Sequence, residues 1–148
     1  MDKKEQTRTP RLTLRKGERL HHRTLVNNVY DKGEALYCYP LRLQWRACDA
    51  DELRASFRAE IPAHIDPLQM MVTIPKRKQR HAVDRVLLRR RVREAYRLNR
   101  LELKEIAKSS GYATISLSFI YISPEKCTYG KIERAMKTLL VKIAEKLG

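Results

Sequence analysis

Residues 76–100, KRKQRHAVDRVLLRRRVREAYRLNR, combine a helical pattern of apolar residues with a charge that is almost entirely positive. Eleven lysines and arginines stand against two acidic residues. A disordered basic tail needs no apolar face, yet three apolar side chains fall in one narrow sector at about 100° per residue: Leu88, Val92 and Ala95. The stretch therefore predicts a helix over about residues 82–108 that packs on a core by one side and ends at Ser-Ser-Gly, residues 109–111.

The arginines on the other side of this helix form a row, which we call the basic ridge. Every fourth residue is Arg, so neighbours lie about 6 Å apart, and like charges at this spacing destabilise an isolated helix by about a few tenths of a kcal/mol per pair. Guanidinium groups present a planar fork of donors that matches phosphate oxygens. We therefore predict that the ridge binds a nucleic acid, with a merely solvated face as the alternative. The ridge comprises Arg85, Arg89, Arg93 and Arg97, widened by Arg90 and Arg100, and a basic loop precedes it with Lys76, Arg77, Lys78 and Arg80.

The totals favour a single domain with a polyanionic partner. The chain has 148 residues and a net charge of +15, of which the 76–100 stretch supplies +9. We expect residues 1–14 to form a mobile basic arm and residues 15–148 to form one RNA-binding domain. Composition alone does not choose between DNA and RNA. With no helix-turn-helix spacing, zinc finger or RNP motif in view, phosphate recognition on structured RNA is favoured.

Several classes of site and location are not indicated. The three cysteines form no Cys-x-x-Cys pair, which is typical of free thiols in a reducing cytoplasm. No apolar run approaches the ~20 residues that span a bilayer, and no secretory signal is visible. Binding of the basic helix to anionic lipid stays open as a rival interpretation. We expect a cytoplasmic protein with no metal site, no membrane contact and no obligate protein partner.

Outside the basic helix, the pattern alternates helices and strands. It predicts a first helix over 18–32, strands over 37–46, 69–74 and 113–122, and a last helix capped by Thr128. A short strand within 53–61 is less clear, after a turn at the CDADE of residues 48–52. In strand 37–46, period-two alternation predicts a core face and an open polar face: the core face has Tyr37, Tyr39, Leu41, Leu43 and Trp45, and the polar face has Arg42, Gln44 and Arg46.

With those residues in view, the sequence resembles the protein component of bacterial ribonuclease P. Residues 19–46 resemble the first helix and strand of that family, and 70–100 resemble its signature strand and helix, including an A-V-x-R-x-x-x-R-R-x-x-R-E-A spacing. There are departures. Of the usual Arg-Asn-Arg only the first residue remains, as Arg85, followed by Val86 and Leu87. Two aromatics four apart in the first helix correspond to Val26 and Tyr30, of which one is aromatic.

The resemblance implies a fold and a role. The fold is an α/β (α+β sandwich) domain, with a central mixed sheet, three helices and a left-handed crossover between parallel strands. The partners are ribonuclease P RNA and precursor tRNA, whose 5′ leader the RNA removes with Mg²⁺ held mainly by RNA and substrate. This chain would supply no catalytic and no metal-binding residue. A cleft between the first helix and the sheet would take the leader, at Val26, Tyr30, Arg42, Gln44 and Arg46.

Two other functions remain to be distinguished. A nuclease acting by itself needs clustered carboxylates that hold metal ions, and the one acidic cluster, Asp49, Asp51 and Glu52, lies in the most loop-like segment. A structural RNA-binding protein of the ribosomal kind would share the basic ridge. It would not explain the specific spacing of the signature.

Overall fold

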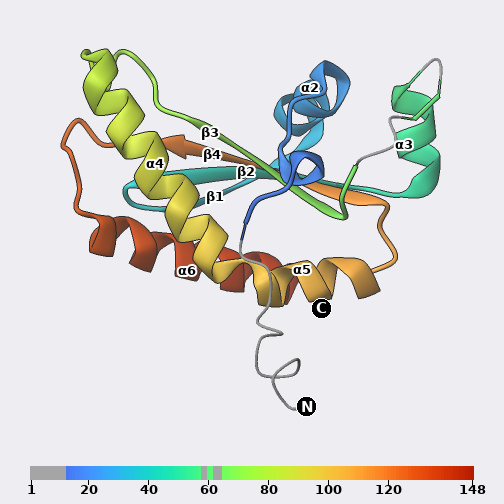
Figure 1. The fold of residues 1–148 in the computed structure, drawn as a ribbon. Coiled ribbons are helices and arrows are strands. Elements are labelled where there is room, and N and C mark those ends of the chain that lie inside the picture. The colour runs from blue at the N-terminus through green and yellow to red at the C-terminus, as the bar shows by residue number, and fades with distance from the viewer. Residues whose placement is uncertain (1–12, 58–59, 62–64) are drawn as a thin grey trace, which may run out of the picture.

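The computed structural model describes residues 13–57, 60–61 and 65–148 (Figure 1). Most of the predicted mobile arm, residues 1–12, lies outside this range. The last residue of the predicted arm, Leu14, packs against the core, so the domain begins slightly earlier than the sequence suggested.

The chain forms one α+β domain around a four-stranded mixed sheet. The strands lie in the order β1-β2-β4-β3, with β3 and β4 parallel and the other pairs antiparallel. The predicted fold class is confirmed, with five α-helices among the described residues where three were expected. The left-handed crossover stays a prediction. In chain order the elements are η1 (Lys16–Glu18), α2 (Arg23–Lys32), β1 (Glu34–Cys38), β2 (Leu41–Cys48), α3 (Ala50–Ser56), β3 (Leu68–Thr73), α4 (Ala82–Asn99), α5 (Leu101–Ser109), β4 (Thr114–Tyr121) and α6 (Tyr129–Leu147).

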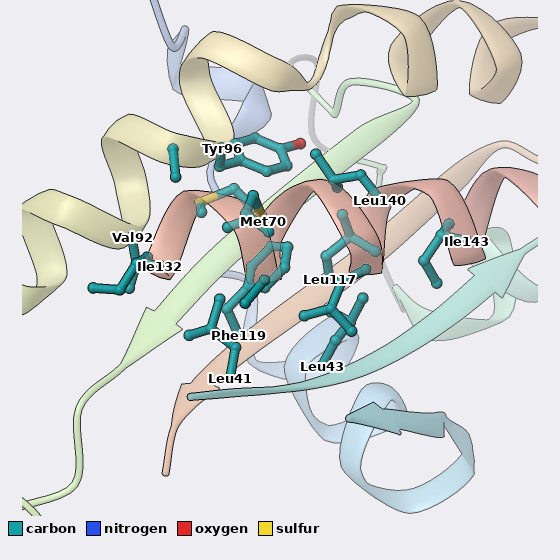
Figure 2. Packing of buried hydrophobic residues seen from close by; sticks show 14 of the residues in the cluster. Leu41, Leu43, Met70, Val92, Tyr96, Leu117, Phe119, Ile132, Leu140 and Ile143 are labelled. Carbon is teal, nitrogen blue, oxygen red and sulfur yellow. The ribbon is translucent and has the colours of Figure 1, made fainter. Parts of the chain in front are cut away.

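Helices cover the two faces of the sheet unequally (Figure 1). α4, α5 and α6 enclose the main core on one face, and α2 and α3 build a smaller cluster on the other. Figure 2 shows side chains of β2 and β4 meeting those of α4 and α6 in the main core. The predicted core sector of α4 is buried, and so is the predicted stripe of α6, whose first turn is capped by Thr128 as expected.

The predicted strand over 37–46 is wrong, because the chain reverses at Tyr39–Pro40 and forms the hairpin β1–β2. In this register Tyr37 lies opposite Arg42 and shares its face, so Tyr37 is 59% exposed, and Tyr39 in the turn is 50% exposed. Side chains on directly opposed residues of an antiparallel pair project to the same side of the sheet. The alternation holds within β2 alone, where Leu41, Leu43 and Trp45 are buried.

Two other segments differ from the prediction. The first helix begins at Arg23, after the separate turn η1. The short strand predicted in 53–61 is wrong, because the segment begins with helix α3, whose Asp49 side chain accepts a hydrogen bond from the Glu52 backbone N–H at 2.7 Å. An N-cap aspartate with carboxylates in the first turn favours a helix. Residues 58–59 lie outside the described range.

The predicted long helix over 82–108 divides at Arg100, which joins α4 to α5. Its guanidinium is 1% exposed and lies in an ion pair with Glu18 of η1, at 2.6 Å between Nε and Oε1. Arg100 also donates to the backbone oxygens of Arg97 and Thr13. The expectation that Arg100 widens the basic ridge is therefore wrong, because this residue ties η1 to the junction of the two helices.

Because Glu18 is a titratable carboxyl group, this ion pair makes the free energy of unfolding depend on pH. Burial by itself raises the pKa of Glu18, but hydrogen bonds from Arg100 and from the Arg15 backbone, with the charges of Arg100 and Lys104, outweigh it and hold the pKa below its ordinary value. A carboxyl with a depressed folded-state pKa stabilises the protein above its unfolded pKa, about 4.3 for Glu, and this contribution is lost as pH falls through the folded value.

We therefore expect the free energy of unfolding to decrease as pH falls below about 4, by less in Glu18→Gln than in the unchanged protein. Urea denaturation of both proteins at a series of pH values measures this pH dependence. An identical pH dependence in both proteins would contradict a role for Glu18.

Candidate nucleic-acid interface

The basic ridge lies on the outward side of α4, but its arginines have different partners. Arg89, Arg90 and Arg93 have no carboxylate partner among the residues that the structure describes. Arg97 forms a 2.7 Å ion pair with Glu94 on the same helix. Arg85 donates to the backbone oxygens of Gln79 and Arg80, at 3.0 and 2.8 Å, and so holds the basic loop against the helix. Of the ridge arginines from Arg85 to Arg97, Arg97 alone is neutralised by a carboxylate of the described residues, and Arg85 and the middle of the ridge keep their positive charge.

The basic loop that precedes α4 is anchored to the segment that follows β4. Gln79 is buried, and its Nε2 donates to the backbone oxygens of Ser123 and Glu125, at 3.3 and 3.2 Å. Lys76, Arg77 and Arg80 are exposed and Lys78 is half-buried. The loop therefore presents four basic residues at the N-terminal end of the ridge on a fixed backbone.

A third segment adds charge that sequence reasoning did not find. Arg19, between η1 and α2, lines a groove of about 260 Å³ with Arg89 and Arg93 of α4 and with His21, beside β3. Burial lowers the pKa of Arg93 below its usual range, and the charges of Arg19 and Arg89 lower it further. Three guanidinium groups at one groove favour an anionic ligand such as a phosphate. Nothing in the local sequence around Arg19 indicates this role, since the chain brings it to α4 only on folding.

A larger hollow of about 540 Å³ adjoins this groove along α4. Arg19 and Arg93 border both hollows, and Arg90 and Tyr129 border the larger one. Arg91 also lines it but donates to the backbone oxygen of Cys127 at 2.6 Å, which holds the loop before α6. Uncompensated arginines therefore border a concave surface into which a phosphate backbone could fit, although the Glu94–Arg97 pair also lines the larger hollow.

The two departures from the usual signature lie at the surface. Val86 is 45% exposed and Leu87 is 37% exposed, and both line a shallow apolar hollow with Val83 and Arg90. Both residues therefore lie at the surface of α4 and outside the core.

We expect Val86→Asn to change the free energy of unfolding by less than about 0.5 kcal/mol, because the side chain is exposed and the two residues have similar helix propensity. Chemical denaturation measures the change. A loss of several kcal/mol would show that Val86 belongs to the core.

The second predicted site lies on the α2 side of the sheet, and the structure brings three of its five residues together. The hydroxyls of Tyr30 and Ser118 share a 2.7 Å hydrogen bond, and Ser118 lies opposite Gln44 in the sheet. Arg42 donates to Gln44 at 2.8 Å. Tyr30 is 43% exposed and Arg42 is half-buried, but Gln44 is only 8% exposed, so the prediction of an open polar face is wrong at Gln44. The side chain of Gln44 instead holds Arg42 beneath a partly open surface.

The other two predicted residues have different surroundings. Arg46 is hydrogen-bonded through two nitrogens to the carboxylate of Glu52, at 2.8–3.0 Å, beside α3. This neutralises the charge of Arg46 and raises its pKa. Val26 is half-buried against the smaller apolar cluster. Their assignment to a leader site stays a prediction, with less exposed charge than the sequence suggested.

The three carboxylates considered for a nuclease are all engaged in a helix cap or in ion pairs. Asp49 caps α3, Glu52 pairs with Arg46, and Asp51 lies 3.4 Å from Arg54. In the described part of the chain, no three His, Cys, Asp or Glu side chains gather as a metal-binding group. Over the same residues, every helix is too short or too polar to cross a bilayer.

Comparison with known proteins agrees with this arrangement. The family model described as Ribonuclease P matches residues 14–144. The chain belongs to the ribonuclease P protein family. Two relatives named Ribonuclease P protein component, from two strains of Porphyromonas gingivalis, are 36% and 37% identical to it. The aligned regions cover 93% and 88% of this chain and 91% and 86% of those relatives.

The fold is also that of a solved family member. The RNase P protein of Staphylococcus aureus, solved at 2.0 Å, superposes with a TM-score of 0.56 at 19% identity, covering 90% of this chain and all of that one. The resemblance inferred from residues 19–46 and 70–100 is confirmed. The family match also includes 47–69, the segment between those two blocks.

Proposed function

We propose that this chain is the protein subunit of ribonuclease P and that it supports endonucleolytic 5′ maturation of tRNA. It binds the ribonuclease P RNA through the basic loop and ridge, and it binds the 5′ leader of precursor tRNA on the sheet face beside α2. The observation that carries this proposal is the groove at which Arg19, Arg89 and Arg93 meet without a carboxylate among the described residues, in a chain of this family.

Catalysis is assigned to the RNA. The only acidic cluster considered is engaged in capping and ion pairs, and the described residues offer no metal-binding group. The residues that the structure describes therefore do not fit a magnesium site. We place the Mg²⁺ that the family implies on the RNA and the substrate, and we assign to the protein only binding and positioning.

Reconstitution tests the proposed function. The purified protein, ribonuclease P RNA and precursor tRNA are combined at low Mg²⁺, and cleavage is measured with each component omitted in turn. We expect cleavage at the mature 5′ end that needs the RNA and is stimulated by the protein. Cleavage by the protein without RNA would identify a nuclease. Binding to structured RNA without stimulation would identify a structural RNA-binding protein.

The leader site has its own test. A photoreactive nucleotide placed a few positions upstream of the cleavage site is expected to cross-link to Tyr30 or Arg42, the two accessible side chains of this group, while Gln44 is buried beneath them. Peptide mapping of the adducts locates the contact. Adducts confined to the basic ridge would reverse the assignment and make α4 the leader site.

A further inference from the structure

Tyr37 is a large aromatic side chain on the open face of the sheet that the predicted leader site does not include. The residue is 59% exposed, although it lies within β1, one position before the strand ends. The guanidinium carbon of its cross-strand partner Arg42 lies 5.7 Å from the centre of the ring. Arg42 is in turn held by its bond to Gln44. An exposed ring with a cation fixed beside it is suited to stack on a nucleobase.

The register of the sheet connects Tyr37 to the residues already assigned to the leader. One cross-strand row on the α2 side contains Tyr37, Arg42, Ile120 and Thr73, one from each strand. The neighbouring row contains Gln44 and Ser118, and Ser118 is bonded to Tyr30. Tyr37 thus lies on the face of the sheet that Tyr30 contacts, in the row next to that of Ser118. β1 is two strands away from β4, so at ~4.8 Å between strands Tyr37 lies about 10 Å from β4.

The order of these residues relative to the basic ridge gives a direction. β3 is the edge strand that leads into the basic loop and α4, and β1 is the opposite edge. A strand of RNA that starts at the ridge and crosses the sheet therefore meets the surface beside Tyr30 before it reaches Tyr37.

We propose that Tyr37 is a stacking surface for a nucleobase of the single-stranded leader, further from the cleavage site than the nucleotides beside Tyr30. This inference rests on the proposed function and adds a second aromatic contact to it. Because every base has a stackable face, the contact selects for length and single-strandedness more than for sequence. Arg42 contributes by positioning the ring and by its charge toward the adjacent phosphate.

The test uses the holoenzyme reconstituted with ribonuclease P RNA. Its affinity for precursor tRNAs is measured as the leader is lengthened one nucleotide at a time, for the unchanged protein and for Tyr37→Ala and Tyr37→Phe. We expect Tyr37→Ala to bind long-leader substrates about tenfold more weakly, the loss of one base–aromatic stack, and to bind short-leader and leaderless substrates normally. Tyr37→Phe keeps the ring and should behave as the unchanged protein.

A matched control is Tyr112→Ala. Tyr112 is also exposed, at 42%, but lies at the other end of the sheet near Lys32 and Glu34, so its replacement should leave all affinities unchanged. Equal weakening of Tyr37→Ala with every substrate, or no weakening with any, would overturn the inference while the proposed function stands. If the unchanged protein fails to stimulate the RNA, both fall together. Unfolding curves confirm that each variant folds.

Discussion

Arg100→Met is expected to lower the free energy of unfolding by about 3–5 kcal/mol, because it removes the 2.6 Å partner of the buried Glu18 carboxylate and leaves it only the longer contact with Lys104, at 3.5 Å. Both side chains are 1% exposed, and the guanidinium also satisfies backbone oxygens of two segments. Replacing only one member of such a pair keeps the desolvation cost of the other. Urea denaturation at neutral pH measures the loss.

The double variant Glu18→Leu with Arg100→Met should recover a large part of this loss, since two apolar residues can replace a buried ion pair at little net cost. The control is Glu94→Gln, which removes the more exposed pair with Arg97 and should cost less than about 1 kcal/mol. A single Arg100→Met variant as stable as this control would show that the buried pair contributes little.

Arg89→Glu is expected to weaken binding to ribonuclease P RNA by about 10- to 100-fold, the effect of removing one charge-assisted contact to phosphate. The slope of log affinity against log salt should flatten by roughly one unit or less. Stability should change little or rise, because a carboxylate would then lie at the groove shared by Arg19 and Arg93. Filter binding over a series of salt concentrations, with a thermal melt of each protein, tests both statements.

The matched control for net charge is Arg134→Glu, since Arg134 is exposed on α6 and the change in charge is the same. It should reduce affinity far less than Arg89→Glu. Equal effects of the two variants would mean that the RNA responds to total charge and that α4 is only a solvated face.

Much of the fold was predictable because it depends on patterns within one element. The core sector of α4 and the stripe of α6 follow from helical spacing, and Thr128 caps α6 as its position suggested. Helix α3 was missed, although Asp49 followed by Glu52 is an N-cap pattern with a carboxylate in the first turn. The hairpin was missed because alternation continues unbroken through Tyr39–Pro40, and period two alone does not mark where a strand reverses.

The candidate site was only partly predictable, because charge spacing does not reveal partners. Arg89, Arg97 and Arg100 all come from one basic stretch, yet only Arg89 lies at the groove with Arg19 and Arg93. Arg97 is paired with Glu94, whose side chain is 46% exposed. Arg100 is buried against Glu18, a residue 82 positions away.

The sequence by itself determined that this protein has a basic amphipathic helix on a mixed α+β core and that it resembles the ribonuclease P family. These features are encoded by local periodicity and by a signature within one segment. Only the tertiary structure decided which basic residues lack a carboxylate partner and which aromatic rings stay exposed. It also decided that the segment around Arg19 joins the basic ridge. The physical reason is that desolvation and charge compensation depend on which segments pack together. Residues such as Arg19, Tyr37 and Arg100 therefore acquire their roles from neighbours that are distant along the chain.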